Sequence, residues 1–215
     1  MHTLLLLRIL YTIVLVRKML FFSMIITLLA KKGGVGKSTL ALLLHESLRQ
    51  AGKSVAVRDW DVQGTSNKAL GLIGGQKAEP GTSYDVLIYD TPPNLEHTAT
   101  AVAVEMAQIA IVVASPSPMD IWEAEEAAQF VKTKNPRAIV RLVFNKVRKG
   151  TVLTGLIEEN ANRLKVPMLK AMLSARECYQ HAAARGWRAL DSAAREEVFQ
   201  LTVALLSLTD GTHTL

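Results

Sequence analysis

The residues best suited to chemistry in this chain of 215 residues form a glycine-rich segment, KKGGVGKST, at residues 31–39. It lies between an apolar run and a helical pattern, which is where a phosphate-binding loop occurs. Glycines let backbone amides wrap around phosphates, and the following helix adds the positive end of its dipole. Lys37 is expected to bridge the β- and γ-phosphates of a nucleotide, and the Ser38 hydroxyl to hold Mg²⁺. The expected nucleotide contacts are Gly33, Gly34, Val35, Gly36, Lys37, Ser38 and Thr39.

Three aspartates follow apolar runs. Asp59 and Asp61 come at the end of one run and are two residues apart, so their carboxylates share one face of an extended chain. Asp90 ends the run YDVLIYD and precedes Thr-Pro-Pro. An apolar strand that ends in Asp is the Walker B arrangement, whose carboxylate approaches Mg²⁺ directly or through water.

Short apolar runs alternate with helical patterns from residue 24 onward. Strands are expected at residues 24–30, 54–58, 84–89, 109–114 and 138–144, with a further short one at 166–169. Helices are expected at residues 38–50, 95–108, 119–134, 151–164, 176–185 and 191–208, and residues 71–82 are the most loop-like. Continuously apolar strands are typical of a parallel sheet that is buried on both faces. The pattern therefore predicts an α/β fold, doubly wound, with a mostly parallel sheet flanked by helices and ligands at the carboxyl ends of the strands.

Together, these motifs resemble those of the ParA/MinD family of ATPases. The loop is similar to the family's deviant Walker A box, because Lys31 replaces the usual first glycine and Lys32 opens the loop. DWDVQG resembles the family's D-x-D-P-Q-G segment, with Val62 in place of proline, and YDVLIYDTPP resembles its Walker B box. RECYQHAAARG resembles a late stretch of small partition ATPases. The resemblance covers about residues 24–208 and is closest to compact ParA proteins without an N-terminal helix-turn-helix domain.

The resemblance implies a role for several of these residues. Lys32 would reach across a dimer to the partner's nucleotide, Asp61 would position the attacking water, and Asp59 would support the water shell of the metal. Asn145 would lie against adenine. Guanine is disfavoured, because Arg148 stands where the N-K-x-D motif of guanine-binding proteins has its Asp. The implied cofactors are ATP and Mg²⁺, with Lys32, Lys37 and Asp61 as the catalytic set and Ser38, Asp59 and Asp90 as the metal set.

Composition excludes several classes of protein. Hydrophobic residues make up 49% and charged residues 20%, which excludes wholesale disorder. Cys178 is the one cysteine, so a disulfide scaffold and a four-cysteine metal site within one chain are excluded, and a reducing, intracellular location fits. Residues 131–190 carry 13 Lys and Arg against 3 Asp and Glu, which indicates either an anionic partner or a solvated face. The candidate DNA contacts in this block are Lys146, Arg148, Lys149, Arg163, Lys165, Lys170 and Arg176.

The first 23 residues differ from the rest of the chain. Their apolar run contains Arg8 and is shorter than the roughly 20 residues that span a membrane, and they do not resemble a secretory signal. The favoured interpretation is that translation starts at Met24 and that residues 1–23 are an extension outside the working protein. A weak interfacial anchor is the alternative. Residues 24–215 are expected to form a single P-loop ATPase domain.

The leading hypothesis for function is a ParA-type partition ATPase. Two subunits would sandwich ATP, the dimer would bind DNA non-specifically, and a ParB-type, centromere-binding adaptor would stimulate hydrolysis, in the cytoplasm and on the nucleoid. A MinD-like, membrane-cycling ATPase is one alternative, disfavoured because residues 191–215 carry 1 basic residue against 4 acidic ones. A ParA-like ATPase of a conjugative or cargo-positioning system is the other. The nitrogenase-reductase type is excluded, because it needs two cysteines in each chain.

Overall fold

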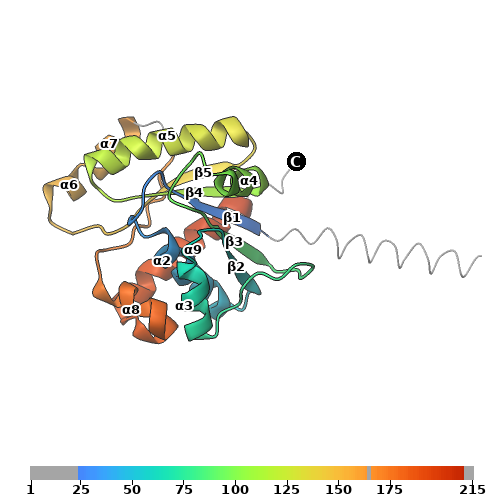
Figure 1. Cartoon of the computed structure of the whole chain (residues 1–215). Coiled ribbons are helices and arrows are strands. Elements are labelled where there is room, and N and C mark those ends of the chain that lie inside the picture. The colour runs from blue at the N-terminus through green and yellow to red at the C-terminus, as the bar shows by residue number, and fades with distance from the viewer. Residues whose placement is uncertain (1–23, 164–165, 211–215) are drawn as a thin grey trace, which may run out of the picture.

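Five parallel strands form the centre of the computed structural model, which describes residues 24–163 and 166–210. They are β1 (Met24–Leu29), β2 (Val55–Asp59), β3 (Val86–Asp90), β4 (Ile109–Ala114) and β5 (Ile139–Phe144). Their order across the sheet is β2-β3-β1-β4-β5 (Figure 1). The chain leaves β1 toward one side of the sheet and later returns past it to the other. The carboxyl end of β1 is therefore at a switch point, where open α/β sheets bind ligands.

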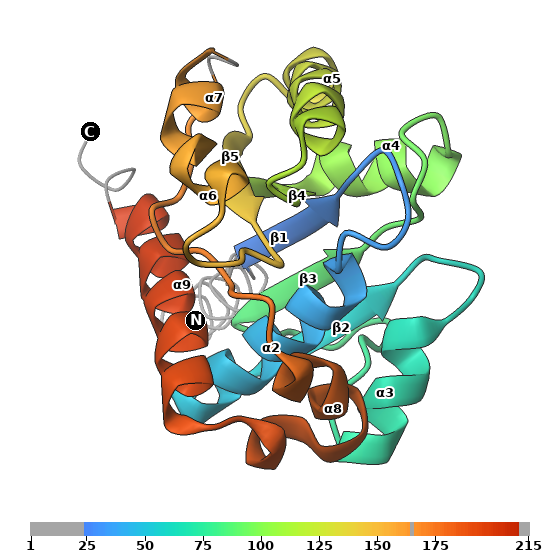
Figure 2. The same cartoon turned by 90° about the vertical axis from the view of Figure 1, so that its left-hand side faces the viewer.

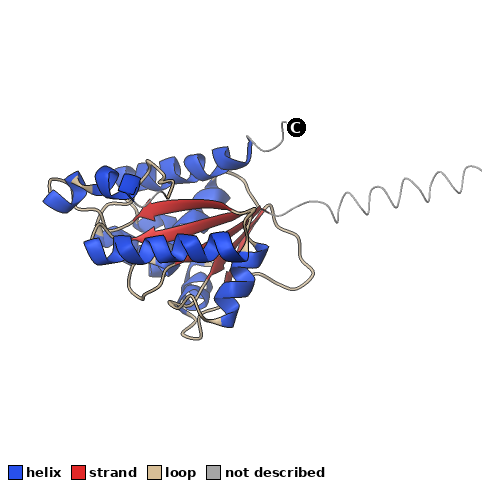
Figure 3. Cartoon of the chain, turned by 90° about the horizontal axis from the view of Figure 1, so that it is seen from above, coloured by secondary structure: helices blue, strands red, loops and turns tan. Residues whose placement is uncertain are grey.

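Helices cover both faces of the sheet (Figures 1 and 3). One face carries α2 (Lys37–Gln50), α3 (Thr65–Ile73), α8 (Glu177–Arg185) and α9 (Ser192–Asp210), and Figure 2 shows α2, α3 and α8 grouped there. The other face carries α4 (Thr98–Met106), α5 (Pro118–Lys134) and α7 (Ile157–Arg163). The short α6 (Val152–Gly155) precedes α7, and the 3-10 turn η1 (Gly186–Ala189) follows α8.

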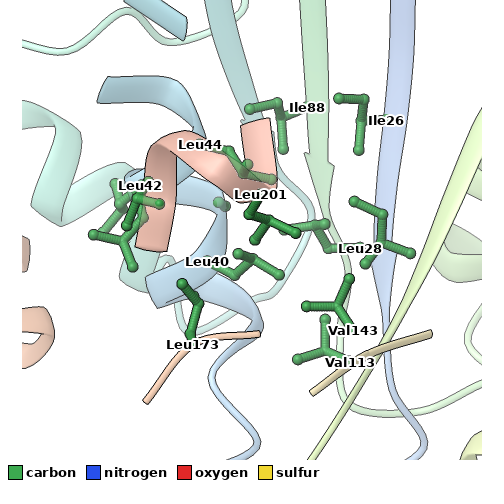
Figure 4. Packing of buried hydrophobic residues seen from close by; sticks show 14 of the residues in the cluster. Ile26, Leu28, Leu40, Leu42, Leu44, Ile88, Val113, Val143, Leu173 and Leu201 are labelled. Carbon is green, nitrogen blue, oxygen red and sulfur yellow. The ribbon is translucent and has the colours of Figure 1, made fainter. Parts of the chain in front are cut away.

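Aliphatic side chains fill the space between sheet and helices. Ile26 and Leu28 of β1 belong to the cluster beneath α2 and α9, whereas Leu29 belongs to the cluster beneath α4 and α5. In Figure 4, Leu40 and Leu44 of α2 and Leu201 of α9 lie on the side that faces the side chains of the sheet. Each fully buried leucine stabilises the fold by roughly 1.5–3 kcal/mol. Because both faces are covered, most positions in the strands are apolar, which is why they lack an alternating pattern. The two arginines, Arg58 and Arg141, lie in the edge strands β2 and β5.

The predicted doubly wound fold is confirmed, with three local differences. The sequence predicts no helix between residues 50 and 95 and a loop at residues 71–82, but the structure has α3 at Thr65–Ile73, which includes Gly71. The helix is stabilised by tertiary contacts, since Leu70 is fully buried. The single helix expected at residues 151–164 is interrupted between α6 and α7, next to Gly155, a poor helix former. The short strand expected at 166–169 is a single bridge between Met168 and Leu142.

No helix in the part of the chain that the structure describes is long and apolar enough to cross a membrane. The N-terminal extension expected at residues 1–23 lies outside the described residues. Both interpretations of that segment therefore stay predictions.

Candidate nucleotide-binding site

The loop between β1 and α2 is shaped by glycines whose backbone lies in the left-handed region. Gly34 has a φ of 82°, and Gly36, the N-cap of α2, has a φ of 98°. A Cβ atom added to Gly36 would lie 2.1 Å from Nδ2 of Asn145, so both the conformation and the space require glycine. Because the N-cap residue Gly36 has no side chain, it cannot accept a hydrogen bond from the first amides of α2. A bound anion would therefore satisfy the first backbone amides of this helix.

Lys37 begins α2 and is 7% exposed. Burial lowers the pKa of its ammonium group, while the charges of Asp90 and Asp61 oppose that shift. The cation thus stands in a poorly hydrated place at the start of a helix, close to two carboxylates. A phosphate group bound in the loop would compensate the cost of burying this charge.

Asp90 ends β3 and is 1% exposed. Its Oδ2 accepts a hydrogen bond from the hydroxyl of Ser66 on α3, and the Ser38 hydroxyl also lies within its reach. Its Oδ1 is buried and has no hydrogen-bond partner among the residues that the structure describes. Burial raises the pKa of this carboxyl, against the opposing effect of the two hydroxyls. A cation beside Oδ1 would compensate the cost of burying this carboxylate oxygen without a hydrogen-bond partner.

The donors around Asp90 fit Mg²⁺ better than a metal held entirely by the protein. No group of three or more His, Cys, Asp or Glu side chains within residues 24–163 and 166–210 could hold a metal ion. Mg²⁺ is commonly bound by one or two protein oxygens together with water and phosphate. The Ser38 hydroxyl and the Asp90 carboxylate provide such a pair.

Asp59 and Asp61 lie at the same edge of the sheet, and Asp59 pairs with Asp90 in the register of β2 and β3. Both carboxylate oxygens of Asp59 accept backbone hydrogen bonds of 3.0 Å, from Asp61 and from Asn67 in the first turn of α3. Asp61 accepts a 3.0 Å bond from the amide of Gln63. In this geometry Asp59 fixes the turn that carries Asp61, and the roles suggested for both by the family pattern remain predictions.

Lys32 at the loop's opening is directed toward α5 of its own chain. Its ammonium forms an ion pair with Asp120 and lies 3.9 Å from a carboxylate oxygen of Glu123. Burial disfavours the ionised form of Asp120. The hydrogen bonds from Lys32 and Ser115 outweigh this effect and keep the pKa of that carboxyl below its usual range. The side chain of Lys32 is still 42% exposed.

A cavity of about 370 Å³ lies beside the phosphate loop. Asn145 lines it, donating from Nδ2 to the carbonyl of Val35 (2.9 Å) and accepting at Oδ1 from the amide of Lys146 (2.8 Å). Lys146 has a positive φ of 59°, and its ammonium donates to the carbonyl of Gly34. Asn145 thus braces the phosphate loop at the edge of the cavity. Its expected contact with adenine stays a prediction.

Polar side chains of α8 and of the segment that leads into it also line this cavity, among them Ser174, Arg176 and Tyr179. Glu197 of α9 accepts hydrogen bonds from Ser174, Arg176 and Tyr179, at 2.8 Å for the closest pair of each. Burial disfavours its charge, but these donors prevail and lower the pKa of Glu197 to about 2. Arg176 also lies 3.7 Å from Asp191.

The candidate DNA-binding residues fall into three groups. Lys146, Arg148, Lys149 and Lys170 are exposed. The charge of Arg176 is largely neutralised by its acidic partners. The side chain of Arg163 and all of Lys165 lie outside the described part of the chain.

Sequence reasoning did not select Ser66, Asp120 or Glu197 as site residues. Ser66 belongs to an otherwise ordinary helix, and its contact with Asp90 exists only because β2 and β3 are paired. Asp120 meets Lys32 because α5 begins beside the loop, and a Pro-x-Pro-x-Asp pattern at residues 116–120 was the signal that could have found it. Glu197 has no local signal at all.

Comparison with known proteins agrees with this geometry. The sequence matches the CobQ/CobB/MinD/ParA nucleotide binding domain over residues 26–188. The maintenance of carboxysome distribution protein A of Halothiobacillus neapolitanus is 23% identical and is matched over 72% of this chain and 81% of its own. The chromosome partitioning protein ParA of Caulobacter vibrioides is 40% identical over a shorter region, 29% of this chain and 22% of its own.

Solved structures show the same fold. The MinD cell division protein of Aquifex aeolicus has a TM-score of 0.71 at 19% identity, with 85% of this chain and 96% of that one covered. A plasmid partition protein of Borrelia burgdorferi, bound to AMPPNP, has a TM-score of 0.69 at 18% identity, covering 86% and 99%. With the loop, the two acidic strand ends and the matched domain in agreement, this chain belongs to the ParA/MinD family of nucleotide-binding ATPases.

Proposed function

We propose that this protein is an Mg-ATP-dependent positioning ATPase of the ParA type, which dimerises on ATP, binds DNA and distributes a cargo. One observation carries the proposal. Lys37, Ser38 and Asp90 converge beside a glycine loop, and the buried Oδ1 of Asp90 has no hydrogen-bond partner in the described part of the chain. A nucleotide and its metal are the ligands that satisfy all of these groups together.

In the proposed complex the loop amides and Lys37 bind the phosphates, while Ser38 and Asp90 hold Mg²⁺. The metal would neutralise charge that develops on the transferring phosphoryl group. Asp61 orients the attacking water, and Asp59 keeps the turn in place through its two backbone hydrogen bonds. Gly33, Val35 and Thr39 complete the expected nucleotide contacts, and Asn145 lies beside the base.

A dimer with ATP at its interface would use the surface around Lys32. Met119 and Trp122, near the start of α5, are 62% and 66% exposed and lie close to the residues that hold Lys32. Exposed apolar side chains of this size are typical of contact surfaces. Lys32 would exchange its bond with Asp120 for the partner's phosphates, so ATP would compete with an internal ion pair.

DNA binding is proposed for the exposed cations Lys146, Arg148, Lys149 and Lys170. Three of them follow β5 directly, at the same edge of the sheet as the phosphate loop. Contacts between such side chains and phosphates need no base recognition, so binding would be non-specific and salt-dependent. Association with the nucleoid would follow.

The kind of cargo is suggested by how much of each relative the chain matches. Carboxysome distribution proteins match over most of their length, whereas the chromosome partitioning relatives match over about a fifth of theirs. This supports a cargo-positioning role, the alternative drawn from the sequence, over partition of a plasmid with a centromere-binding, ParB-type adaptor. In either case a partner on the cargo would stimulate hydrolysis.

Calorimetric titration with Mg-ATP tests the nucleotide site. Lys37→Ala should weaken binding roughly thirtyfold or more, because this variant removes a charge-assisted hydrogen bond in a buried site. Lys53→Ala removes an exposed lysine just beyond α2 and should bind like the wild type. Circular dichroism checks that both variants are folded. Wild-type affinity in folded Lys37→Ala would refute the assignment of this site.

A further inference from the structure

A second concave surface lies at the opposite end of α2 from the phosphate loop. It encloses about 680 Å³ between the ends of α2 and α3 and the turn from α8 into η1. A helix of this length spans about 20 Å, so the groove is remote from the nucleotide. Figures 1 and 2 show α3 and α8 side by side. Its lining residues are Glu46, Arg49, Gln50, Leu72, Ile73 and residues 184–188.

The turn from α8 into η1, which lines the groove, is held in place by several contacts. Gly186 has a φ of 61° and a ψ of −149°, a conformation that only glycine adopts readily. A Cβ there would lie 3.1 Å from a carboxylate oxygen of Glu46 and 3.5 Å from Cβ of Ile73. Glu46 also accepts a 3.3 Å bond from the amide of Trp187 and lies 3.4 Å from Arg49. These contacts fix η1 against α2 and α3.

The walls combine apolar and cationic groups. Leu72 is 71% exposed at the end of α3, and Ile73 and Trp187 are half-buried beside it. Arg185 and Arg188 are exposed and form no ion pair with any residue in the described ranges 24–163 and 166–210. The one carboxylate of the groove, Glu46, is already engaged. The groove therefore offers two unpaired arginines beside an exposed leucine and a tryptophan.

We infer that this groove is a docking site for an acidic peptide segment with apolar side chains, carried by a partner protein. Charge complementarity requires acidic groups opposite Arg185 and Arg188. Leu72 and Trp187 favour aliphatic or aromatic side chains between those groups, since tryptophan and arginine dominate the energetics of such contacts. Nucleic acid would satisfy the arginines but would leave Leu72 exposed. The inference goes beyond the proposed function and requires neither ATP nor hydrolysis.

Fluorescence anisotropy with a labelled synthetic peptide tests the inference on the full chain. The probe contains glutamate and leucine at helical spacing. Two comparison peptides of equal length contain glutamate without leucine, and lysine in place of glutamate. The wild type should bind the first peptide more tightly than either comparison peptide. The double variant Arg185→Glu/Arg188→Glu should weaken its binding by about tenfold or more, because two attractive charge pairs become repulsive.

Lys132→Glu/Lys134→Glu provides the matched control, with the same change of charge at exposed positions near the end of α5, on the other face of the sheet. It should bind the peptide within about twofold of the wild type, since charges this far away are screened. Leu72→Ser, at an exposed position, should weaken binding without loss of thermal stability. A photo-crosslinking version of the probe should label residues 184–188 or the end of α3.

Three results would overturn the inference. The first is equal binding of all three peptides. The second is loss of duplex DNA binding in the Arg185→Glu/Arg188→Glu variant while the peptide is ignored, which would make the groove part of a nucleic-acid surface. The third is concentration-dependent self-association, in sedimentation velocity, that this variant abolishes, which would make a second copy of the chain the occupant.

Discussion

Asp90 is a buried carboxylate with one oxygen that no described residue contacts by a hydrogen bond, and burial raises its pKa. An acid whose pKa is raised by folding binds more protons in the folded state, so stability falls as pH rises above about 3.8 and stays reduced at neutral pH. The protein without ligand is therefore destabilised by the group expected to hold Mg²⁺. Functional sites often show this conflict between stability and activity.

Replacing this carboxylate separates its effect on the stability of the ligand-free protein from its effect on Mg-ATP binding. Asp90→Asn should raise the melting temperature of the ligand-free protein at pH 7, by roughly 2–4 °C if the variant gains about 1 kcal/mol, because the amide cannot ionise. The same variant should lose the increase in melting temperature that Mg-ATP gives the wild type. Differential scanning fluorimetry with and without Mg-ATP measures both. A lower melting temperature for ligand-free Asp90→Asn at pH 7 would contradict this explanation.

Lys32 and Asp61 lie at different ends of the site, so substitutions at these two positions should impair the ATPase cycle at different steps. Lys32→Ala should bind ATP within about tenfold of the wild type, yet lose ATP-dependent dimers and hydrolysis, as removal of an arginine finger lowers rates by about 10³–10⁵. Asp61→Ala should bind ATP and form stable dimers, but hydrolyse slowly. Light scattering with ATP and a phosphate-release assay distinguish the two. Normal dimers and turnover in Lys32→Ala would make this residue a solvated loop lysine.

At the scale of elements, the site depends on contacts that join distant segments. Ser66 links the start of α3 to β3, and Asp59 caps the same helix from β2. On the other side of the phosphate loop, Glu197 of α9 holds the segment that runs into α8 along the cavity. These contacts set the position of helices that would contact the nucleotide only indirectly.

The Glu197 cluster predicts a specific dependence of stability on pH. Its pKa is lowered to about 2, so its stabilising effect is complete above about pH 4.5 and is lost as pH falls toward 2. Glu197→Gln should therefore melt below the wild type at pH 7, and the difference should shrink as the pH is lowered through this range. Glu125→Gln, at an exposed position, should match the wild type at every pH. A pH-independent difference for Glu197→Gln would show that packing, and not charge, is responsible.

At the scale of the whole molecule, the two ends of the sheet have different properties. The carboxyl end carries the phosphate loop, the acidic strand ends and the exposed cations that follow β5. The amino end carries the groove between α3 and η1. Helix α2 spans the distance between them, with Lys37 at one end and Glu46 and Arg49 near the other.

The position of the cations predicts how DNA binding should respond to salt. Arg148→Ala/Lys149→Ala should weaken binding to duplexes of any sequence and lower the slope of log affinity against log salt by about 1 for each phosphate that is no longer neutralised. Lys132→Ala/Lys134→Ala removes the same charge at the other end of the sheet and should leave the slope unchanged. Electrophoretic mobility shift with ATP, over a series of salt concentrations, measures both. Binding to acidic vesicles without binding to DNA would favour the membrane-cycling alternative.

The sequence by itself determined the five strands and most of the helices, the phosphate loop and the acidic strand ends, because these depend on local patterns. A glycine run between an apolar strand and a helix, and an Asp after an apolar run, can be recognised within a few residues. The structure pairs Asp59 with Asp90 at the ends of β2 and β3, as expected of two aspartates that each follow an apolar strand. The family and the fold class were predictable for the same reason.

Only the tertiary structure decided which side chains meet. Lys32 pairs with Asp120, Asn145 braces the carbonyl of Val35, and Ser66 donates to Asp90, although each pair is separated by many residues. The tertiary structure also brings Glu197 against Arg176, a candidate DNA contact, and so neutralises its charge. Such contacts depend on how helices pack on a sheet, and no local pattern encodes that geometry. The short helix α3 was missed for the same reason, since tertiary contacts outweigh the weak helix propensity of a segment that contains Gly71.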